Sequence, residues 1–167
     1  QPRVPPELGR DEKGEPVGIE HYRKWSDKIG QGGEPVGEQA LENLAALGYR
    51  TVISVDGAAP DVETAARYGL RYAHVPIGYD GITSQAALQI VKAVEESDGP
   101  VFFHCHHGLH RGPAATAIAR VAVDGVSNAD ALDGLNKSGC SPKYQGLFRD
   151  VGSFAAPSAD ALAKTPS

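Results

Sequence analysis

Residues 101–115 read Val-Phe-Phe-His-Cys-His-His-Gly-Leu-His-Arg-Gly-Pro-Ala-Ala, and this stretch decides the fold. Its apolar and aromatic start predicts a buried strand, and the alanine-rich sequence after Pro113 predicts a helix. Proline suits the first turn of a helix, where the missing N–H is not needed. The loop from Cys105 to Arg111 would then face free backbone N–H groups and the positive end of a helix dipole. These features predict an anion site in which the positive field and Arg111 favour the thiolate form of Cys105, which is the nucleophilic form.

Strand-like and helix-like segments alternate along the rest of the chain. Apolar residues at helical spacing, with suitable caps, predict helices over 37–47, 62–68, 83–96, 113–124, 127–135 and 144–154. Segments rich in β-branched or aromatic residues predict strands over 49–55, 70–76 and 101–104, and an edge strand over 21–25. The glycine-rich stretch 29–35 lacks the Lys-Ser/Thr ending of a nucleotide-binding loop and is interpreted as a turn. We therefore expect an α/β fold, a single three-layer domain whose central, mostly parallel sheet is flanked by helices.

The composition is that of an ordinary globular protein. The chain has 167 residues, of which 41% are hydrophobic and 22% charged, enough for one domain with its own core. A formal net charge of −5 argues against nucleic acid as a partner, and no apolar run approaches the roughly eighteen residues of a membrane span. Two cysteines do not make a disulfide framework. We expect a monomer without a cofactor.

The two ends of the chain differ in composition from its middle. Residues 1–18 contain four prolines and three glycines and are predicted to form an extended arm, followed by a folded domain over 19–154 and a flexible tail over 155–167. Residue 1 is glutamine, which we interpret as the result of truncation or of cleavage of a leader. The proline-rich opening suits a linker after a leader. Both a periplasmic and a cytoplasmic location therefore stay open.

The spacing His-Cys-x-x-Gly-x-x-Arg is present at His104, Cys105, Gly108 and Arg111. It resembles the signature of the cysteine-dependent protein tyrosine phosphatase superfamily, and the short chain is most similar to the compact dual-specificity group and its small bacterial relatives. The resemblance implies a protein tyrosine phosphatase-like fold with a catalytic domain over 19–154, and hydrolysis of phosphate monoesters in two steps. First, Cys105 attacks phosphorus while Arg111 and the loop amides hold the phosphoryl oxygens and an aspartic acid protonates the leaving oxygen. Water then hydrolyses the cysteinyl-phosphate.

The resemblance also implies roles for the other loop residues. The expected phosphate-binding loop, which would take phosphate, sulfate or vanadate, consists of His106, His107, Gly108, Leu109, His110 and Arg111. His104 would support the loop through hydrogen bonds rather than act as a base. The three loop histidines would line the rim of the pocket and gain positive charge as the pH falls. So many histidines beside a cysteine raise the question of a metal site. Because side chains around a tight anion loop mostly point away from a common centre, no metal is expected.

The general acid is expected in the segment that follows the strand before the nucleophile's own strand, because an alkoxide or phenolate leaves poorly without a proton. Asp80 lies in that place, and the glycines at 78 and 81 would let the segment move over a bound substrate. The alternative is Asp56, which follows another strand. Asp61 and Asp98 are interpreted as helix-start and turn residues.

Gly112 departs from the family pattern. Relatives usually have Ser or Thr directly after the loop arginine, where the hydroxyl helps the thiolate to leave in the second step. Gly112 keeps the backbone N–H and lacks the hydroxyl. We therefore hypothesise that breakdown of the phosphoenzyme limits turnover.

Two other functions stay open at this point. A rhodanese-like sulfurtransferase also holds an anion above a cysteine, although its loop is typically one residue shorter than the five residues between Cys105 and Arg111. A catalytically weak phospho-binding module is the second alternative, because of Gly112 and the open assignment of the acid. The second cysteine, Cys140, could protect Cys105 as a resolving thiol, but its turn-like surroundings favour a packed, inert residue.

Overall fold

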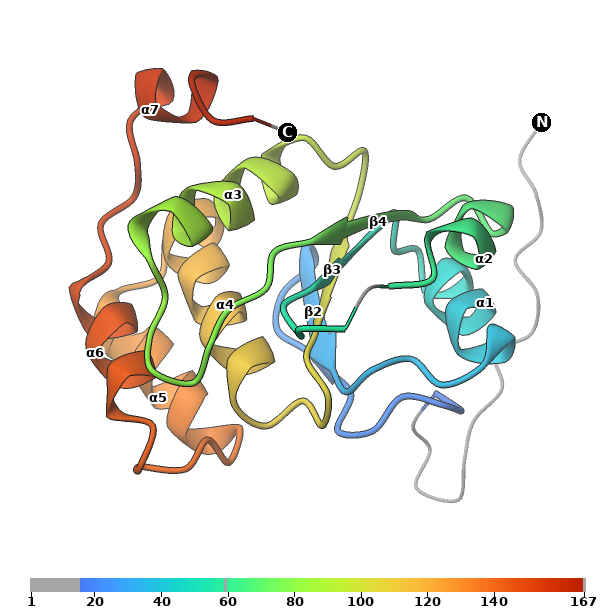
Figure 1. The fold of residues 1–167 in the computed structure, drawn as a ribbon, viewed down its shortest axis with the longest axis horizontal. Coiled ribbons are helices and arrows are strands. Elements are labelled where there is room, and N and C mark those ends of the chain that lie inside the picture. The colour runs from blue at the N-terminus through green and yellow to red at the C-terminus, as the bar shows by residue number, and fades with distance from the viewer. Residues whose placement is uncertain (1–15, 59, 167) are drawn as a thin grey trace.

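The computed structural model describes residues 16–58 and 60–166, so most of the predicted extended arm lies outside the described residues. Five strands form one sheet in the order β1-β2-β5-β3-β4 (Figure 1). In chain order these strands are β1 (Arg23–Lys24), β2 (Ile29–Gly32), β3 (Thr51–Ser54), β4 (Arg71–His74) and β5 (Val101–His104). Four of them run parallel, and only β1 pairs antiparallel, with β2, among the described strands. The predicted mostly parallel sheet is confirmed. The strand predicted over 101–104 has these bounds, and the other three predicted strands are present in a shorter form.

The interpretation of residues 29–35 as a turn is wrong for their first half. Ile29–Gly32 forms β2, which is buried along its whole length between β1 and β5. Its glycines serve close packing: a Cβ on Gly32 would lie only 3.1 Å from Cζ of Phe102 on the neighbouring strand. Glycine inside a strand often marks such a close approach rather than a turn.

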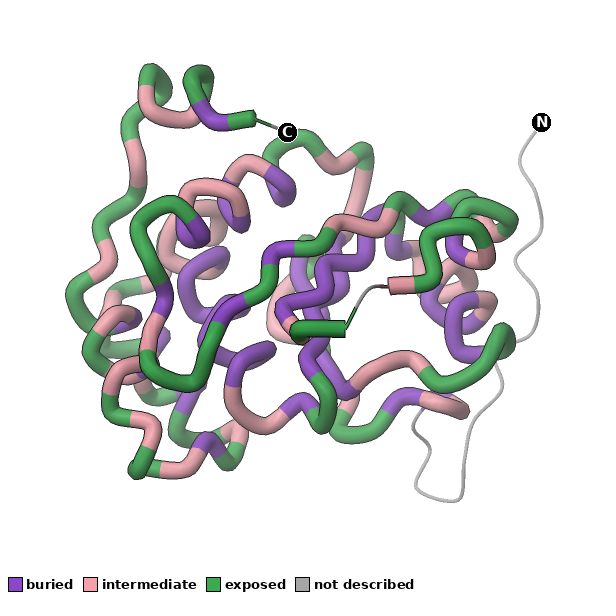
Figure 2. Tube along the Cα trace, viewed as in Figure 1, coloured by how far each residue is buried: buried purple, intermediate pink, exposed green. Residues whose placement is uncertain are grey.

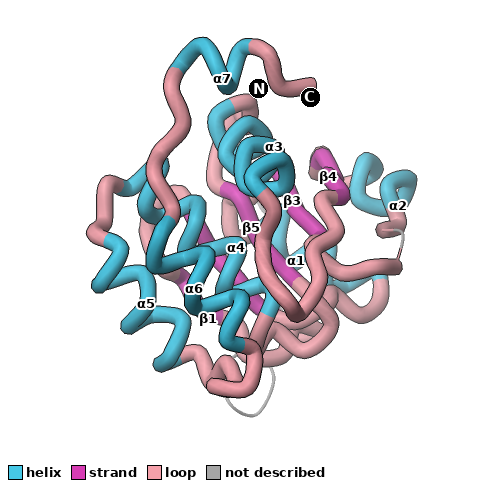
Figure 3. The backbone as a smooth tube through the Cα atoms, turned by 60° about the vertical axis from the view of Figure 1, so that its left-hand side comes forward, coloured by secondary structure: helices cyan, strands magenta, loops and turns pink. Residues whose placement is uncertain are grey.

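Helices cover both faces of the sheet, as Figures 1 and 3 show. One face carries α1 (Glu38–Ala46) and α2 (Val62–Arg67). The other is covered by α3 (Ser84–Glu95) and α4 (Arg111–Ala119), with α5 (Asn128–Lys137) and α6 (Gln145–Ser153) packed on α4. A π-helical turn, η1 (Arg120–Asp124), extends α4, and α7 (Ala159–Ala163) packs against α3 near the end of the chain. The expected three-layer α/β architecture is therefore present.

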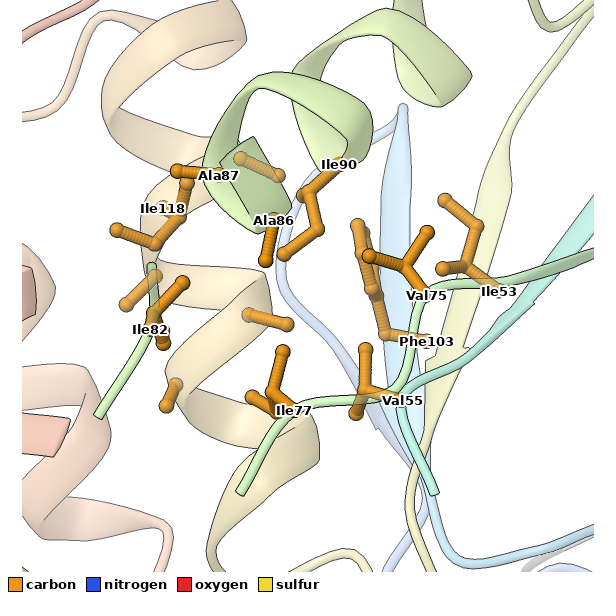
Figure 4. Packing of buried hydrophobic residues seen from close by; sticks show 14 of the residues in the cluster. Ile53, Val55, Val75, Ile77, Ile82, Ala86, Ala87, Ile90, Phe103 and Ile118 are labelled. Carbon is orange, nitrogen blue, oxygen red and sulfur yellow. The ribbon is translucent and has the colours of Figure 1, made fainter. Parts of the chain in front are cut away.

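The sheet separates two hydrophobic clusters, because alternate side chains of a strand point to opposite faces. Phe102 belongs to the smaller cluster, under α1 and α2, and Phe103 to the larger one, under α3 and α4. Figure 4 shows the larger cluster, in which Ile90 of α3 and Ile118 of α4 share the core with Phe103. In Figure 2, α4 is buried along its whole length. This helix therefore holds the end of β5 rigidly against the rest of the domain.

Local sequence signals set several helix boundaries. The side chains of Thr83 and Ser127 accept hydrogen bonds from the first turns of α3 and α5. The helix predicted from 113 begins two residues earlier, at Arg111, so Pro113 lies in its first turn. No helix in the described ranges combines the length and the apolar character that a membrane crossing requires.

Candidate active site

The loop from Cys105 to His110 joins β5 to α4 at the carboxyl ends of the parallel strands (Figure 1). Ligands of such sheets bind at this edge. Cys105 lies at the base of the loop and is only 3% exposed. A Cβ placed on Gly112, in the first turn of α4, would lie 3.3 Å from the Cys105 sulfur. The sulfur therefore lies directly beside the N-terminus of a fully buried helix.

The backbone of this loop turns its carbonyl groups outward. The carbonyls of His106, His107 and Gly108 accept hydrogen bonds from residues at the end of β2 and before β1. The donors are the Glu34 N–H at 3.1 Å, His21 Nδ1 at 2.8 Å and Gln31 Nε2 at 2.8 Å. None of the N–H groups of residues 105–110 donates a hydrogen bond to a partner in the described part of the chain. A run of free N–H groups beside a helix N-terminus is an anion-binding arrangement.

Gly108 allows the loop to take this shape. Its φ is +79°, in the region that glycine adopts most readily. A Cβ on Gly108 would also lie 2.6 Å from the backbone carbon of Gly32 and the backbone nitrogen of Gly33. The glycines of β2 and of the loop therefore let two stretches of backbone pack directly against each other.

Arg111 begins α4, and its guanidinium group is held on two sides. Nη2 donates to Asp56 Oδ1 at 3.0 Å, and Cζ lies 4.4 Å from the centre of the Tyr79 ring, a cation–π contact. The residue is 8% exposed, yet its Nε has no hydrogen-bond partner among the described residues. A buried donor without a partner costs about 1–3 kcal/mol. An anionic ligand in the loop would relieve this cost.

Asp56, the alternative general acid, is engaged by this arginine. Burial works to raise the pKa of Asp56. The hydrogen bond from the Gly57 N–H and the charge and hydrogen bond of Arg111 outweigh burial, and the pKa is lowered. Asp56 is therefore ionised at neutral pH and holds the guanidinium group. An ionised carboxylate has no proton to give to a leaving group.

His104 and Tyr72 form a hydrogen-bonded pair behind the nucleophile. Burial lowers the pKa of His104 to about 4, so its ring is neutral at pH 7. Nδ1 lies 3.3 Å from the Cys105 carbonyl oxygen, which can only accept, so Nδ1 carries the proton. Nε2 then accepts from the Tyr72 hydroxyl at 2.5 Å, and burial raises the pKa of Tyr72 so that it keeps its proton. Tyr72 thus fixes the tautomer of His104.

Asp80 lies in the segment that follows β4. Its neighbour Tyr79 covers the Arg111 guanidinium and also packs on Tyr144, with ring centres 4.7 Å apart. Asp80 itself is exposed, and its carboxylate makes no hydrogen bond within the described residues. A Cβ on Gly78 would lie 2.6 Å from Asp80 Oδ1, so the side chain folds back over this glycine.

The loop histidines differ in their surroundings. His106 and His107 are exposed, with ring centres 4.2 Å apart. Nδ1 of His106 lies 3.6 Å from Glu34 Oε2. His110 is half-buried, and its Nδ1 accepts the Ser141 N–H at 3.1 Å. Burial, then the charges of Lys143 and Arg111, lowers the pKa of His110.

Three side chains at the mouth have the chemistry of metal ligands. Donor atoms of Glu34, Asp56 and His106 lie within 4.8 Å of one another. However, Asp56 already forms an ion pair with Arg111. The positive guanidinium group would repel a cation bound at this carboxylate.

Both cysteines of the chain are free, as expected. Cys140 is buried, in the loop between α5 and α6. Burial, with a smaller effect of the negative charge of Cys105, raises the pKa of the Cys140 thiol to about 11. Cys140 therefore stays a protonated thiol at neutral pH.

Three residues that contact this site were absent from the sequence-based assignment: Gln31, Tyr72 and Tyr79. Gln31 is 1% exposed and bonds the Gly108 carbonyl across 77 positions of sequence. A polar residue between the two glycines of a buried strand indicates a specific contact. This signal can be used only once residues 29–32 are recognised as a strand. Tyr72 and Tyr79 carry no local signal, because their partners are remote in sequence.

No protein-family model matches the sequence. Two curated sequences, each called Beta-lactamase hydrolase-like protein, from two strains of Xylella fastidiosa, are 30% identical to it over 119 residues. This alignment covers 66% of the chain. The chain spans only 27% of the length of these relatives.

Solved structures resemble the chain over most of its length. TpbA of P. aeruginosa has a TM-score of 0.68 at 20% identity, over 88% of this chain and 94% of TpbA. A Cys-to-Ser variant of TpbA, solved in complex with phosphotyrosine, has a TM-score of 0.63 at 19% identity, over 80% of this chain and 91% of that one. The core catalytic domain of the PP-IP phosphatase SIW14 of S. cerevisiae, in complex with citrate, has a TM-score of 0.68 at 14% identity, over 83% of this chain and 88% of that domain.

Proposed function

Because the chain has the fold of the small cysteine-dependent tyrosine and dual-specificity phosphatases, we propose that it hydrolyses phosphate monoesters through Cys105. The sulfur attacks phosphorus, and the free N–H groups of residues 105–110 and the Arg111 guanidinium bind the phosphoryl oxygens. Water then attacks the cysteinyl-phosphate and releases inorganic phosphate.

One observation carries this proposal above the others: the partnerless Nε of the buried Arg111 beside a run of free backbone N–H groups. Each is a donor, and together they lie around one cysteine at a helix N-terminus. A tetrahedral oxyanion offers several acceptors at once, which is what this set of donors requires. A ligand without acceptor atoms would leave the Arg111 Nε without a hydrogen-bond partner among the described residues.

We assign the general acid to Asp80. Its segment follows β4 and carries Tyr79, whose ring covers Arg111. The competing Asp56 has a lowered pKa and is committed to the ion pair with Arg111. In this scheme the two carboxylates have separate roles, since Asp56 orients the cation and Asp80 supplies the proton.

Hydrolysis of a panel of phosphate monoesters tests the proposed function. We expect the wild-type chain to hydrolyse p-nitrophenyl phosphate and a phosphotyrosine peptide, and Cys105→Ser to lose this activity while it still binds vanadate. Loss of more than about 10³-fold is typical for removal of a nucleophile. Hydrolysis by Cys105→Ser at the wild-type rate would contradict the proposal.

Two further assays separate the alternatives. Transfer of sulfur from thiosulfate to cyanide would identify a rhodanese-like sulfurtransferase. Binding of a phosphotyrosine peptide by the wild-type chain without hydrolysis of any ester would identify a phospho-binding module. The Arg111→Lys variant serves as a control in both, because lysine keeps the charge but cannot offer the paired donors of a guanidinium group.

A further inference from the structure

The first half of α6 packs directly against the segment that carries Asp80. A Cβ placed on Gly146, in the first turn of α6, would overlap the carbonyl oxygen of Asp80. Gly146 does not have a positive φ, so its backbone conformation is open to any residue. Close approach to the Asp80 backbone is therefore what requires glycine at this position.

A second contact fixes the same segment one turn further along α6. Asp150 Oδ2 accepts the N–H of Ile82 at 2.8 Å, and a Cβ on Gly81 would overlap this same oxygen. Arg149 holds the carboxylate in place, with Nε 2.9 Å from Oδ1 and Nη2 3.2 Å from Oδ2 of Asp150. The Nη2 of Arg149 also lies 3.5 Å from the Asp80 carbonyl oxygen.

We propose that Gly146 and Asp150 are positioning residues for the general acid, an inference that rests on the proposed function of Asp80. Together they fix the backbone at residues 80, 81 and 82 and leave the Asp80 carboxylate free of hydrogen bonds within the described residues. The glycines at 78 and 81 then serve close packing, against the Asp80 side chain and against Asp150, rather than movement of a lid. In this proposal α6 holds the backbone of the segment that contains Asp80, and so sets the distance of the acid from Cys105.

A second glycine of α6 provides a matched control. Gly152, in the last turn, would place a Cβ 3.3 Å from Leu132 Cδ1, the end of a flexible side chain. Alanine generally stabilises a helix relative to glycine by up to about 1 kcal/mol. Gly152→Ala and Gly146→Ala therefore make the same chemical change in the same helix, but only Gly146→Ala displaces the backbone of Asp80.

The test compares kcat/KM for phenyl phosphate, a poor leaving group, with kcat/KM for p-nitrophenyl phosphate, a good one. This constant reports phosphoenzyme formation even if the second step limits turnover. We expect Gly146→Ala to lower kcat/KM for phenyl phosphate about tenfold more than for p-nitrophenyl phosphate, because a displaced acid loses part of its contribution of roughly 10²–10⁴-fold. Gly152→Ala should keep the wild-type ratio.

Asp150 gives an independent variant series if Gly146→Ala does not fold. Asp150→Ala should change the ratio in the same direction, and Asp150→Asn should recover part of the loss, because its amide oxygen can still accept the Ile82 N–H. In an Asp80→Asn background, neither change should alter the ratio further, since the acid through which they act is absent. Thermal unfolding of every variant reports any general loss of stability.

The outcomes separate the inference from the proposed function. If the wild-type chain hydrolyses both esters and Cys105→Ser does not, but Gly146→Ala and Asp150→Ala lower both constants equally, the positioning role is overturned and the phosphatase assignment stands. If Cys105→Ser retains activity, or the wild-type chain hydrolyses neither ester, both are overturned.

Discussion

The nucleophile loop, residues 105–111, and the acid segment, residues 77–82, are held in different ways. The nucleophile loop is contiguous in sequence with the strand and the helix that support it, and its base is buried. The acid segment follows an edge strand, is largely exposed around Asp80, and is held by α6, whose residues come more than sixty positions later. The nucleophile loop is therefore supported both by the adjacent strand and helix and by remote residues such as Gln31, whereas the acid segment depends on a distant helix.

This difference lies in how the backbone of each region is supported. A loop between a central strand and a buried helix is anchored at both ends by buried structure. A segment beside an edge strand needs contacts supplied from elsewhere in the chain. The two carboxylates illustrate this: Asp56 pairs with the arginine of the nucleophile loop, whereas the Asp80 carboxylate makes no hydrogen bond within the described residues and depends on the placement of its backbone.

The largest expected effect separates the two carboxylates. Asp80→Asn should lower kcat/KM for phenyl phosphate by about 10²-fold and for p-nitrophenyl phosphate much less, because only the poor leaving group needs the proton. Asp56→Asn should lower both constants by a similar factor of about tenfold, because it removes the charged partner that orients Arg111. Steady-state rates with both esters measure this contrast.

The opposite pattern would change the assignment of the general acid. A leaving-group dependence confined to Asp56→Asn would move the acid to Asp56 and leave Asp80 as a surface residue. Asp61→Asn is the matched control, because this carboxylate caps α2 through Thr64. It should leave the ratio of the two constants unchanged.

The second prediction concerns the nucleophile loop alone. Gly112→Ser restores the hydroxyl that relatives usually carry and should speed breakdown of the phosphoenzyme about tenfold, the effect of one hydrogen bond to a charged leaving group. A Cβ at this position would lie 3.3 Å from the Cys105 sulfur, so the hydroxyl is within reach after a shift of a few tenths of an ångström. Rapid-quench kinetics should show a burst in the wild-type chain and a smaller one in Gly112→Ser.

Absence of a burst in the wild-type chain would show that the second step is not limiting. Gly112→Ala provides the steric control, since it adds the Cβ without the hydroxyl. An equal gain with alanine would mean that packing, rather than hydrogen bonding, sets the rate.

The smallest expected effect is on the free energy of unfolding, and it concerns the hydrogen-bonded pair of His104 and Tyr72 behind the nucleophile. The pKa of His104 is lowered from 6.5 to about 4 by burial, so the unfolded chain binds more protons between these pH values. The free energy of unfolding should therefore fall as the pH drops from about 6.5 to about 4, by at most about 3 kcal/mol from this residue. The pKa of His110 is lowered too, so it adds to the fall in the same range.

Tyr72→Phe isolates the contribution of His104. Without the hydroxyl donor, the buried Nε2 has no partner, and the free energy of unfolding at pH 7 should fall by about 1–2 kcal/mol. Tyr68→Phe, at a half-buried tyrosine whose hydroxyl makes an exposed hydrogen bond to Glu38, should have a much smaller effect. Urea denaturation from pH 4 to pH 7 measures both. Equal losses for the two variants would contradict the proposed support of His104 by Tyr72.

Local patterns in the sequence predict the fold class, three of the four parallel strands, most helices and the nucleophile loop, because each depends on neighbouring residues. The buried strand β2 escaped prediction because its glycines pack against residues remote in sequence, Gly30 against Tyr49 and Gly32 against Phe102. The pairing of Asp56 with Arg111 likewise depends on strand order, which the sequence shows only indirectly.

The central claim is that the phosphoryl group is transferred to the sulfur of Cys105. Mass spectrometry of the acid-quenched wild-type chain during turnover of p-nitrophenyl phosphate tests it most directly. The account predicts a phosphoryl group on the peptide that contains Cys105, and none on the same peptide of Cys105→Ser. Phosphate on another residue, or hydrolysis by Cys105→Ser at the wild-type rate, would contradict it.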